Sequence, residues 1–407
     1  MSVKAKPPTP ASSAARQASA RLHRKVDEAV EQIALARKIA HQAQIREAVT
    51  RSELTAAVAD ALAARAAAEA ARREAALGRY LAQARPRPLR RRGRPLRWFE
   101  EMIARLGSVG RAWAIAASGV WRETGRPLFD FRHMAAYARR RAEPGVAPAT
   151  LFDQAWYLET YADVRQARAA PLVHYLLAGG RENRCPHPLF DAAWYRTENA
   201  AELAATGLSP LEHYLRAGAA QARSPHPLFD VAHYLAQGAE PAAGEDLLSH
   251  YLREGWRLGL SPHPLFDVAW YRKRARPPRE VPPLVHYVTA GWRKGISPHP
   301  LVDPAWYLMQ NPDVAEAGCE PLTHFVAAGA REGRSPGPLF DLAHYVAARG
   351  KALPEGGNPL IDYLQGGAWV VAEARPGFPT AAYIAAHPDL GRLGLTPLEH
   401  WARHHAS

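Results

Sequence analysis

The sequence predicts an all-α protein made of tandem two-helix repeats, preceded by a long N-terminal helical or coiled-coil segment. A Leu-Phe-Asp phrase recurs every 36–39 residues over most of the chain. Helix-capping residues stand at the same places in each period, and residues 16–84 contain no proline. A fixed period of this length is typical of a solenoid-like array of short helices.

Residues 1–15 are rich in Pro, Ser, Ala and Lys and are expected to form a disordered tail. Residues 16–84 are dominated by Ala, Glu, Arg and Gln, a composition that favours a long helix. Ser52 is a candidate N-cap inside this segment. Because the apolar seam is thin and rich in alanine, we expect a helical hairpin or a weak coiled coil. The seam consists of Leu22, Val26, Val30 and Ile33, and then of Leu54, Val58 and Leu62.

Residues 85–97, RPRPLRRRGRPLR, form a basic linker in which seven of thirteen positions are arginine. Its three prolines exclude a continuous helix. The linker is either a solvated connection or an electrostatic contact with phosphate, in lipid headgroups or in nucleic acid. The arginines are Arg85, Arg87, Arg90, Arg91, Arg92, Arg94 and Arg97.

Residues 98–124 are expected to form an amphipathic, aromatic helix. Two roles fit this composition: the helix lies at a membrane surface beside the basic linker, or it caps the end of the repeat array. Its large apolar residues are Trp98, Phe99, Met102, Ile103, Leu106, Trp113, Ile115, Val120 and Trp121.

Residues 125–407 are predicted to form the repeat array. A shorter, degenerate copy begins at Phe129-Asp130, and seven fuller copies follow at spacings of 38, 39, 37, 36, 38 and 38 residues. Their opening residues are Phe152, Phe190, Phe229, Phe266, Val302, Phe340 and Phe378.

The first helix of each copy is expected to start at the aspartate that follows the opening residue, because an aspartate side chain caps the free N–H groups of the first turn. Asp303-Pro304 is the best example, with proline at the first helical position. We expect about ten helical residues. An aromatic pair follows the cap in four copies: Trp156-Tyr157, Trp194-Tyr195, Trp270-Tyr271 and Trp306-Tyr307.

The second helix is expected to start at capping boxes such as Ser209 with Glu212 and Thr396 with Glu399. A His-Tyr pair or a close variant comes next in each copy. A glycine five residues after the histidine is interpreted as the C-terminal stop of this helix. These glycines are Gly179, Gly218, Gly255, Gly291 and Gly329, with Gly367 in the copy where Asp362 replaces the histidine.

At this level of detail the copies resemble a known repeat family. The stretch VDPAWYLMQNPDVAEAGCEPLTHFVAAGAREGRSPGPLFD, Val302 to Asp341, resembles a tandem repeat found in bacterial proteins of polysaccharide biosynthesis, often beside or within glycosyltransferases. The resemblance covers about residues 125–407. It implies a bacterial protein of glycan synthesis, but the repeat has no catalytic motif to carry over.

Many of the eighteen histidines recur once per copy, which raises a metal site as an alternative to a structural role. Neighbouring copies would place equivalent histidines roughly 10 Å apart, too far for one ion. We expect the His-Tyr histidine to bond with the capping aspartate or loop backbone instead. Asp163, Asp313 and Asp389 are interpreted as loop caps rather than calcium ligands, since no dense acidic loop surrounds them. No cofactor is expected.

The Trp-Tyr pairs have two interpretations: core packing between copies, or a platform on which sugar rings stack. Net charge is +13 and the two cysteines have no metal-binding spacing. No run of 18 apolar residues and no secretory leader is present, so we expect a cytoplasmic location.

The function expected from these observations is that of a non-catalytic scaffold or adaptor in bacterial surface-polysaccharide synthesis. It would dock a glycosyltransferase or an assembly protein, form homo-oligomers through residues 16–84, and contact the inner membrane peripherally. The alternatives are an accessory part of a glycosyltransferase and a glycan-binding protein. Nucleic acid is not expected as a partner, because only residues 85–97 favour it.

Overall fold

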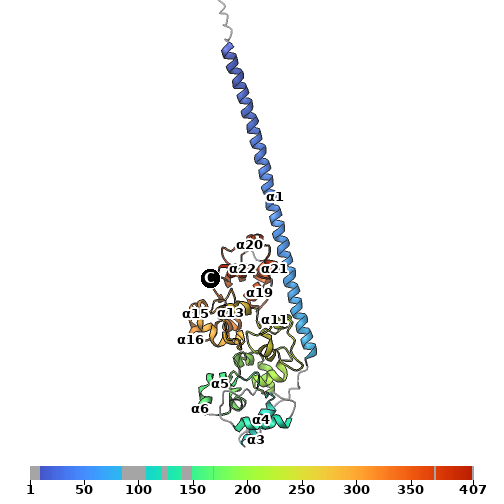
Figure 1. Ribbon diagram of the computed structural model, residues 1–407, viewed down its shortest axis with the longest axis vertical. Coiled ribbons are helices and arrows are strands. Elements are labelled where there is room, and N and C mark those ends of the chain that lie inside the picture. The colour runs from blue at the N-terminus through green and yellow to red at the C-terminus, as the bar shows by residue number, and fades with distance from the viewer. Residues whose placement is uncertain are drawn as a thin grey trace, which may run out of the picture.

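The computed structural model describes residues 10–84, 107–121, 127–139, 149–167, 169–370 and 373–405. The protein is mostly helical, at 65%, and these described residues form no strand. The predicted all-α class is therefore confirmed. Figure 1 shows one long helix, α1, lying beside a body of short helices and projecting well beyond it.

The N-terminal segment is a single helix, so the expected hairpin is wrong. Helix α1 (Pro10–Gln83) runs without a break for 74 residues, and Ser52 lies inside it rather than at its start. Nothing in the segment interrupts helical hydrogen bonding, because proline is absent and the one glycine, Gly78, comes near the end. The C-terminal part of α1 packs against the body, where Leu62 and Ala76 are buried. Residues 31–49 are exposed throughout.

Two helices close the first end of the body. They are α3 (Ser108–Ser118) and α4 (Pro127–Arg139), and the Arg139 Nε donates to Ser108 Oγ at 3.1 Å. Within the described part of the aromatic segment, Ile115 and Val120 are buried, whereas Trp113 is exposed. The ring of Trp121 packs edge-on against Tyr137 at 5.6 Å. Residues 98–106 lie outside the described part.

We number the sequence copies 1 to 7 from Phe152 to Phe378. Their first helices are shorter than the ten residues expected and comprise α5 (Gln154–Thr160), α8 (Ala192–Glu198), α11 (Val231–Ala236), α13 (Val268–Ala275), α15 (Pro304–Gln310), α18 (Leu342–Arg349) and α20 (Thr380–Ala386). Copies 1, 2, 5 and 7 contain an additional short helix that the sequence did not predict. These helices are α6 (Ala162–Ala167), α9 (Ala200–Thr206), α16 (Pro312–Glu316) and α21 (Leu390–Leu393).

The second helix of copies 1 to 5 has one α-helical turn followed by a π-helical turn. The α-helical turns are α7 (Pro171–His174), α10 (Pro210–His213), α12 (Leu247–His250), α14 (Pro283–His286) and α17 (Pro321–His324). The π-helical turns are η1 (Tyr175–Gly179), η2 (Tyr214–Gly218), η3 (Tyr251–Gly255), η4 (Tyr287–Gly291) and η6 (Phe325–Gly329). Single π turns are rare in proteins, so their recurrence indicates a specific local requirement. Copies 6 and 7 have α19 (Pro359–Leu364) and α22 (Pro397–His405) instead. Three short 3₁₀ helices are η5 (Trp292–Lys294), η7 (Gly350–Ala352) and η8 (Gly367–Trp369).

Two hydrogen bonds connect one copy to the next. The backbone N–H of the capping aspartate donates to a proline carbonyl in the following loop, as from Asp191 to Pro225 at 3.0 Å. A tyrosine hydroxyl also accepts from a leucine N–H 35 residues later: Tyr137 from Leu172 and Tyr363 from Leu398. Both bonds satisfy buried backbone groups that would otherwise be costly.

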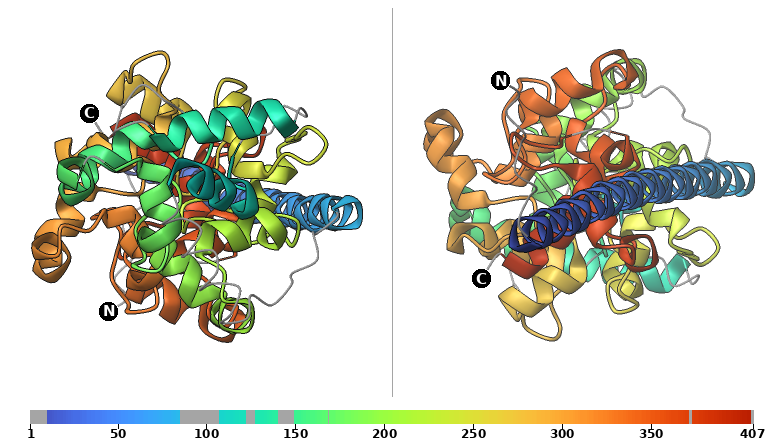
Figure 2. Two further views of the ribbon diagram at one scale, coloured as in Figure 1. Left: turned by 90° about the horizontal axis from the view of Figure 1, so that it is seen from below. Right: turned by 90° about the horizontal axis from the view of Figure 1, so that it is seen from above.

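Copies that are far apart in the sequence also meet. The copies ascend from α4 at one end of the body to α20 and α22 at the other (Figure 1), and Figure 2 shows them distributed around that axis. Accordingly, Arg403 of α22 pairs with Asp267 of copy 4, and Glu399 of α22 lies 3.2 Å from His299. The Tyr80 hydroxyl of α1 donates to the Ala219 carbonyl at 2.9 Å.

Candidate functional site

The recurrent aspartates have the capping role that the sequence predicts. In copies 1 to 6 the aspartate side chain accepts the backbone N–H three residues later, at about 3 Å in each case. The pairs are Asp153 with Trp156, Asp191 with Trp194, Asp230 with His233, Asp267 with Trp270, Asp303 with Trp306 and Asp341 with His344. The predicted capping box of Ser209 and Glu212 is also present.

The tyrosine after the Trp or His lies in the core and bonds with the His-Tyr histidine of its own copy. The Tyr195 hydroxyl lies 2.8 Å from His213 Nδ1, and His213 Nε2 lies 3.1 Å from Glu202. Burial raises the pKa of Tyr195 and lowers that of His213, so the tyrosine O–H donates to a neutral imidazole. The expected histidine partner, a capping aspartate or loop backbone, is therefore wrong. The other pairs are Tyr157–His174, Tyr234–His250, Tyr271–His286, Tyr307–His324 and Tyr383–His400, with Tyr345–Asp362 in copy 6.

This tyrosine explains why a glycine recurs at one position in copies 1 to 6. A Cβ at Gly179 would overlap with the Tyr157 hydroxyl, and one at Gly218 with that of Tyr195. The same holds for Gly255, Gly291, Gly329 and Gly367. None of these glycines has a positive φ. The interpretation of these glycines as C-terminal helix stops is therefore wrong about the physical reason. Glycine is needed because a tyrosine hydroxyl approaches its Cα closely, and not because the backbone takes a left-handed turn.

The structure separates the two members of each Trp-Tyr pair. Tyr157, Tyr195, Tyr271 and Tyr307 are almost completely buried. Trp156, Trp194 and Trp306 are half-buried, and Trp270 is buried under the guanidinium groups of Arg274 and Arg403. Of these four pairs, only Trp156, Trp194 and Trp306 therefore reach the surface. All seven candidate arginines of residues 85–97 lie outside the described residues.

A second set of histidines, in the Pro-His-Pro loops, is buried along the connections between copies. The Nδ1 atoms accept the N–H of the leucine two residues later, at 3.0–3.2 Å, in His187, His226, His263 and His299. Burial lowers the pKa of His187 and of His226 to about 4, and that of His263 to about 3. His187, His226 and His263 are therefore neutral near pH 7 and stabilise their loops through these hydrogen bonds. Among the described residues, no group of three or more His, Cys, Asp or Glu side chains could hold a metal ion.

Two of the three aspartates considered as calcium ligands form ion pairs instead. Asp313 accepts two hydrogen bonds from Arg334, at 2.9 and 2.8 Å, and Asp163 accepts one from Arg184 at 2.8 Å. These arginines lower the pKa of both carboxyl groups. Both aspartates therefore anchor the loop that leads into the next copy, a role that the capping interpretation did not foresee.

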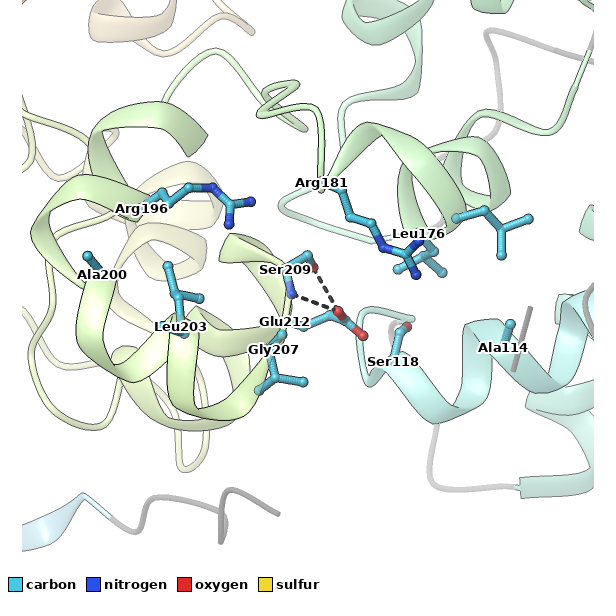
Figure 3. Close-up of a pocket in the computed structure, with 13 residues that line it drawn as sticks. Ala114, Ser118, Leu176, Arg181, Arg196, Ala200, Leu203, Gly207, Ser209 and Glu212 are labelled. Atoms are coloured by element: carbon cyan, nitrogen blue, oxygen red, sulfur yellow. Dashed lines mark hydrogen bonds between the residues drawn. The ribbon is translucent and has the colours of Figure 1, made fainter. Parts of the chain in front are cut away.

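One cavity, of about 470 Å³, lies where α3 meets copies 1 and 2. Figure 3 shows Arg196 on one side of Ser209 and Glu212 and Arg181 on the other, with the Arg181 guanidinium group lying near Leu176. Its apolar lining includes Leu176, Leu177, Leu203 and Leu208. This volume and mixed lining are typical of small-molecule sites. The sequence does not predict this cavity. No sequence signal sets its residues apart, because Arg181 and Arg196 have arginine counterparts in Arg257 and Arg272.

Comparisons of the chain with protein-family models, with curated proteins and with solved structures found no match. Among the described helices, none combines the length and the apolar character needed to cross a bilayer.

Proposed function

We propose that this protein is a non-catalytic scaffold or adaptor of bacterial surface-polysaccharide synthesis, which docks a glycosyltransferase or another assembly protein. Residues 125–407 would act as a solenoid-like array of tandem two-helix repeats. The pathway in this proposal comes from the resemblance of the repeat. The role as an interaction protein is supported by the geometry.

The observation that carries the proposal is the projecting part of α1. This helix leaves the body and continues past α20 (Figure 1), with Ile33, Leu35, Ile39, Ile45 and Val49 each about half exposed. At 3.6 residues per turn, the last four of these lie within about a third of the helix circumference. An apolar stripe on an otherwise unsupported helix is suited to pairing with another helix.

The recurrent polar residues of the copies support a structural rather than a catalytic role for the array. The aspartates cap helices, the His-Tyr histidines hold buried tyrosines, and the loop histidines brace turns. Each of these groups makes a hydrogen bond that stabilises the fold, and a catalytic role would require the group to give up that bond.

The rest of the proposal follows from this assignment. The chain would reside in the cytoplasm, with residues 85–97 in peripheral contact with the anionic inner membrane. Residues 16–84 would mediate homo-oligomerisation or pair with a helix of the docked protein.

Site-specific photo-cross-linking in the native host tests the proposal. A photoreactive phenylalanine analogue is placed at Leu35 or Ile39 in the full chain, and at exposed Met309 on the body as the matched control. We expect α1 positions to capture a glycosyltransferase or a polysaccharide-assembly protein, and the control position to capture less. If the α1 positions capture only polysaccharide or no partner protein, the adaptor proposal is wrong.

A further inference from the structure

Large apolar side chains are exposed on α3 and α4, at the end of the body opposite the projecting part of α1 (Figure 1). Val109 and Trp113 of α3 and Phe129 of α4 are each about half exposed, and Leu128 of α4 is 85% exposed. We call these four residues the end surface. Viewed from that end, both helices lie on the near side of the body (Figure 2, left). A cluster of exposed apolar side chains on a folded protein indicates a binding surface.

The Leu-Phe phrase of α4 is exposed by its local structure. Phe190 and Phe266, which stand directly before the capping aspartates of copies 2 and 4, are completely buried. In α4 the phrase lies instead in the first turn of the helix. At 3.6 residues per turn, Leu128 is on the side of α4 opposite Tyr137, which is buried against the body. Leu128 and Phe129 are therefore available for a contact outside the chain.

The charged side chains of α3 and α4 complement an anionic partner. Arg111 of α3 and Arg132 and Arg139 of α4 are exposed. The single acidic residue of the two helices, Asp130, is only 4% exposed. Arg132 comes one helical turn after Leu128, so that a cation lies beside the apolar side chains. Apolar side chains next to arginines, without an exposed carboxylate on the same helices, are suited to the surface of an anionic bilayer.

The end surface is held in place before any partner binds. The Arg139 Nε donates to Ser108 Oγ at 3.1 Å and thereby joins α4 to α3. A guanidinium N–H of Arg216 in copy 2 donates to the carbonyl of Ala117 in α3. The Tyr137 hydroxyl donates to the Gln154 side chain of copy 1 at 2.6 Å. Because both helices are fixed to the body, binding would not have to order them.

We propose that the end surface binds an anionic lipid bilayer. Trp113, Leu128 and Phe129 enter the boundary between headgroups and acyl chains, where tryptophan is common in membrane proteins, and the three arginines pair with lipid phosphates. The proposal rests on the peripheral membrane contact of the proposed function, and it assigns that contact to folded residues of α3 and α4. The body would then stand on the membrane with the projecting part of α1 directed away from it (Figure 1).

Co-sedimentation of the full chain with vesicles tests the proposal. The vesicles contain phosphatidylcholine with about 30 mol% phosphatidylglycerol, and pure phosphatidylcholine vesicles are the comparison. We expect binding to the anionic vesicles to be at least about tenfold tighter. Leu128→Ser combined with Phe129→Ser should weaken this binding by at least about tenfold, because two apolar side chains no longer enter the bilayer. Leu258→Ser combined with Met309→Ser is the matched control at exposed positions elsewhere on the body and should leave the affinity unchanged.

Fluorescence quenching by lipids brominated in their acyl chains gives a second readout. Trp113→Phe should reduce the quenched fraction of the tryptophan emission, whereas Trp306→Phe should not. Circular dichroism of each variant establishes that it is folded.

Three results would overturn the proposal: no binding to anionic vesicles, equal effects of the two serine pairs, or equal quenching in the two phenylalanine variants. Binding that is lost only when the arginines of residues 85–97 are replaced with glutamine would also overturn it, because the linker would then make the contact. A failure of the α1 cross-links would contradict the adaptor role and leave these vesicle results unchanged.

Discussion

At the scale of the residue, the hydrogen bond between Tyr157 and His174 makes a neighbouring glycine obligatory. Gly179→Ala places a methyl group against the Tyr157 hydroxyl and should lower the free energy of unfolding by about 1–3 kcal/mol. Tyr157→Phe alone should cost about 1 kcal/mol. The double variant should cost clearly less than the sum, because the other atoms around a Cβ at Gly179 lie at 3.5 Å, an ordinary contact. Denaturant unfolding of the four proteins measures the coupling.

The control for this cycle is Gly78→Ala. Gly78 lies within α1 and has no atom within 4 Å of an added Cβ, so alanine should be neutral or should stabilise the helix by up to about 1 kcal/mol. If the losses in free energy of unfolding of the two single variants add up to that of the double variant, the Tyr157 hydroxyl is not the reason for the glycine at 179.

The buried loop histidines predict a loss of stability in acid. The pKa of His226 is about 4 in the folded protein and about 6.5 when unfolded, so the folded state takes up fewer protons between these values. The stabilisation is therefore complete above pH 6.5 and is lost as the pH falls toward 4. At pH 5 this histidine alone should cost about 2 kcal/mol relative to pH 7.

His226→Asn tests this dependence, since an asparagine oxygen can still accept the Leu228 N–H in the same turn. The variant should lose less stability than the parent protein between pH 7 and pH 5 in denaturant titrations. An unchanged difference between the two pH values would show that His226 does not contribute to the acid sensitivity.

Local residue roles were predictable from the sequence where both partners are close along the chain. The Asp191 cap and the Ser209–Glu212 box each act over three residues, and both were predicted. The Tyr195–His213 bond spans 18 residues, and nothing in the sequence pairs one aromatic position with one histidine. The cavity forms where α3 packs against copies 1 and 2, and no local pattern in the sequence predicts which distant elements meet.

At the scale of the element, α1 shows where helix-end signals fail. Ser52 has a good N-cap sequence, yet the helix continues through it because the preceding residues are also strong helix formers. A cap can start a helix only where the chain before it is not helical. The near-absence of proline and glycine therefore predicts one unbroken helix, and this signal is stronger than the single candidate N-cap at Ser52.

The exposed stripe of α1 predicts self-association that depends on apolar side chains. Replacing Leu35 and Ile39 together with lysine should shift the full chain toward monomer in analytical ultracentrifugation, because both side chains are more than half exposed. The control replaces Gln32 and Gln44 with lysine, which adds the same charge without removing apolar surface. A parent chain that is already monomeric at high concentration would contradict homo-oligomerisation through residues 16–84.

At the scale of the whole molecule, contacts over more than one copy tie the body together. An open solenoid has contacts only between nearest neighbours. Here Arg403 reaches back from copy 7 to Asp267 and to the ring of Trp270. The period of the copies was readable from the sequence, but the curvature that brings copy 7 onto copy 4 was not, because it accumulates from small rotations at each junction.

Removing this return contact should loosen copy 4 selectively. Arg403→Gln is expected to lower the local opening free energy of α13 by on the order of 1 kcal/mol, since the ion pair is only partly exposed. Hydrogen exchange should therefore accelerate in α13 and remain unchanged in α5. Arg392→Gln on α21 is the control. Equal acceleration in both helices would show that the effect is global rather than local.

The length of α1 gives the molecule a long lever. From Pro10 to Leu62, the first buried side chain among those described, the helix spans roughly 80 Å at 1.5 Å per residue. A partner that binds near the N-terminal end of α1 is therefore separated from the copies by more than the width of a typical small domain. A stiff helix sets a minimum distance between a partner bound at its end and a partner bound to the copies, whereas a flexible linker would set only a maximum distance.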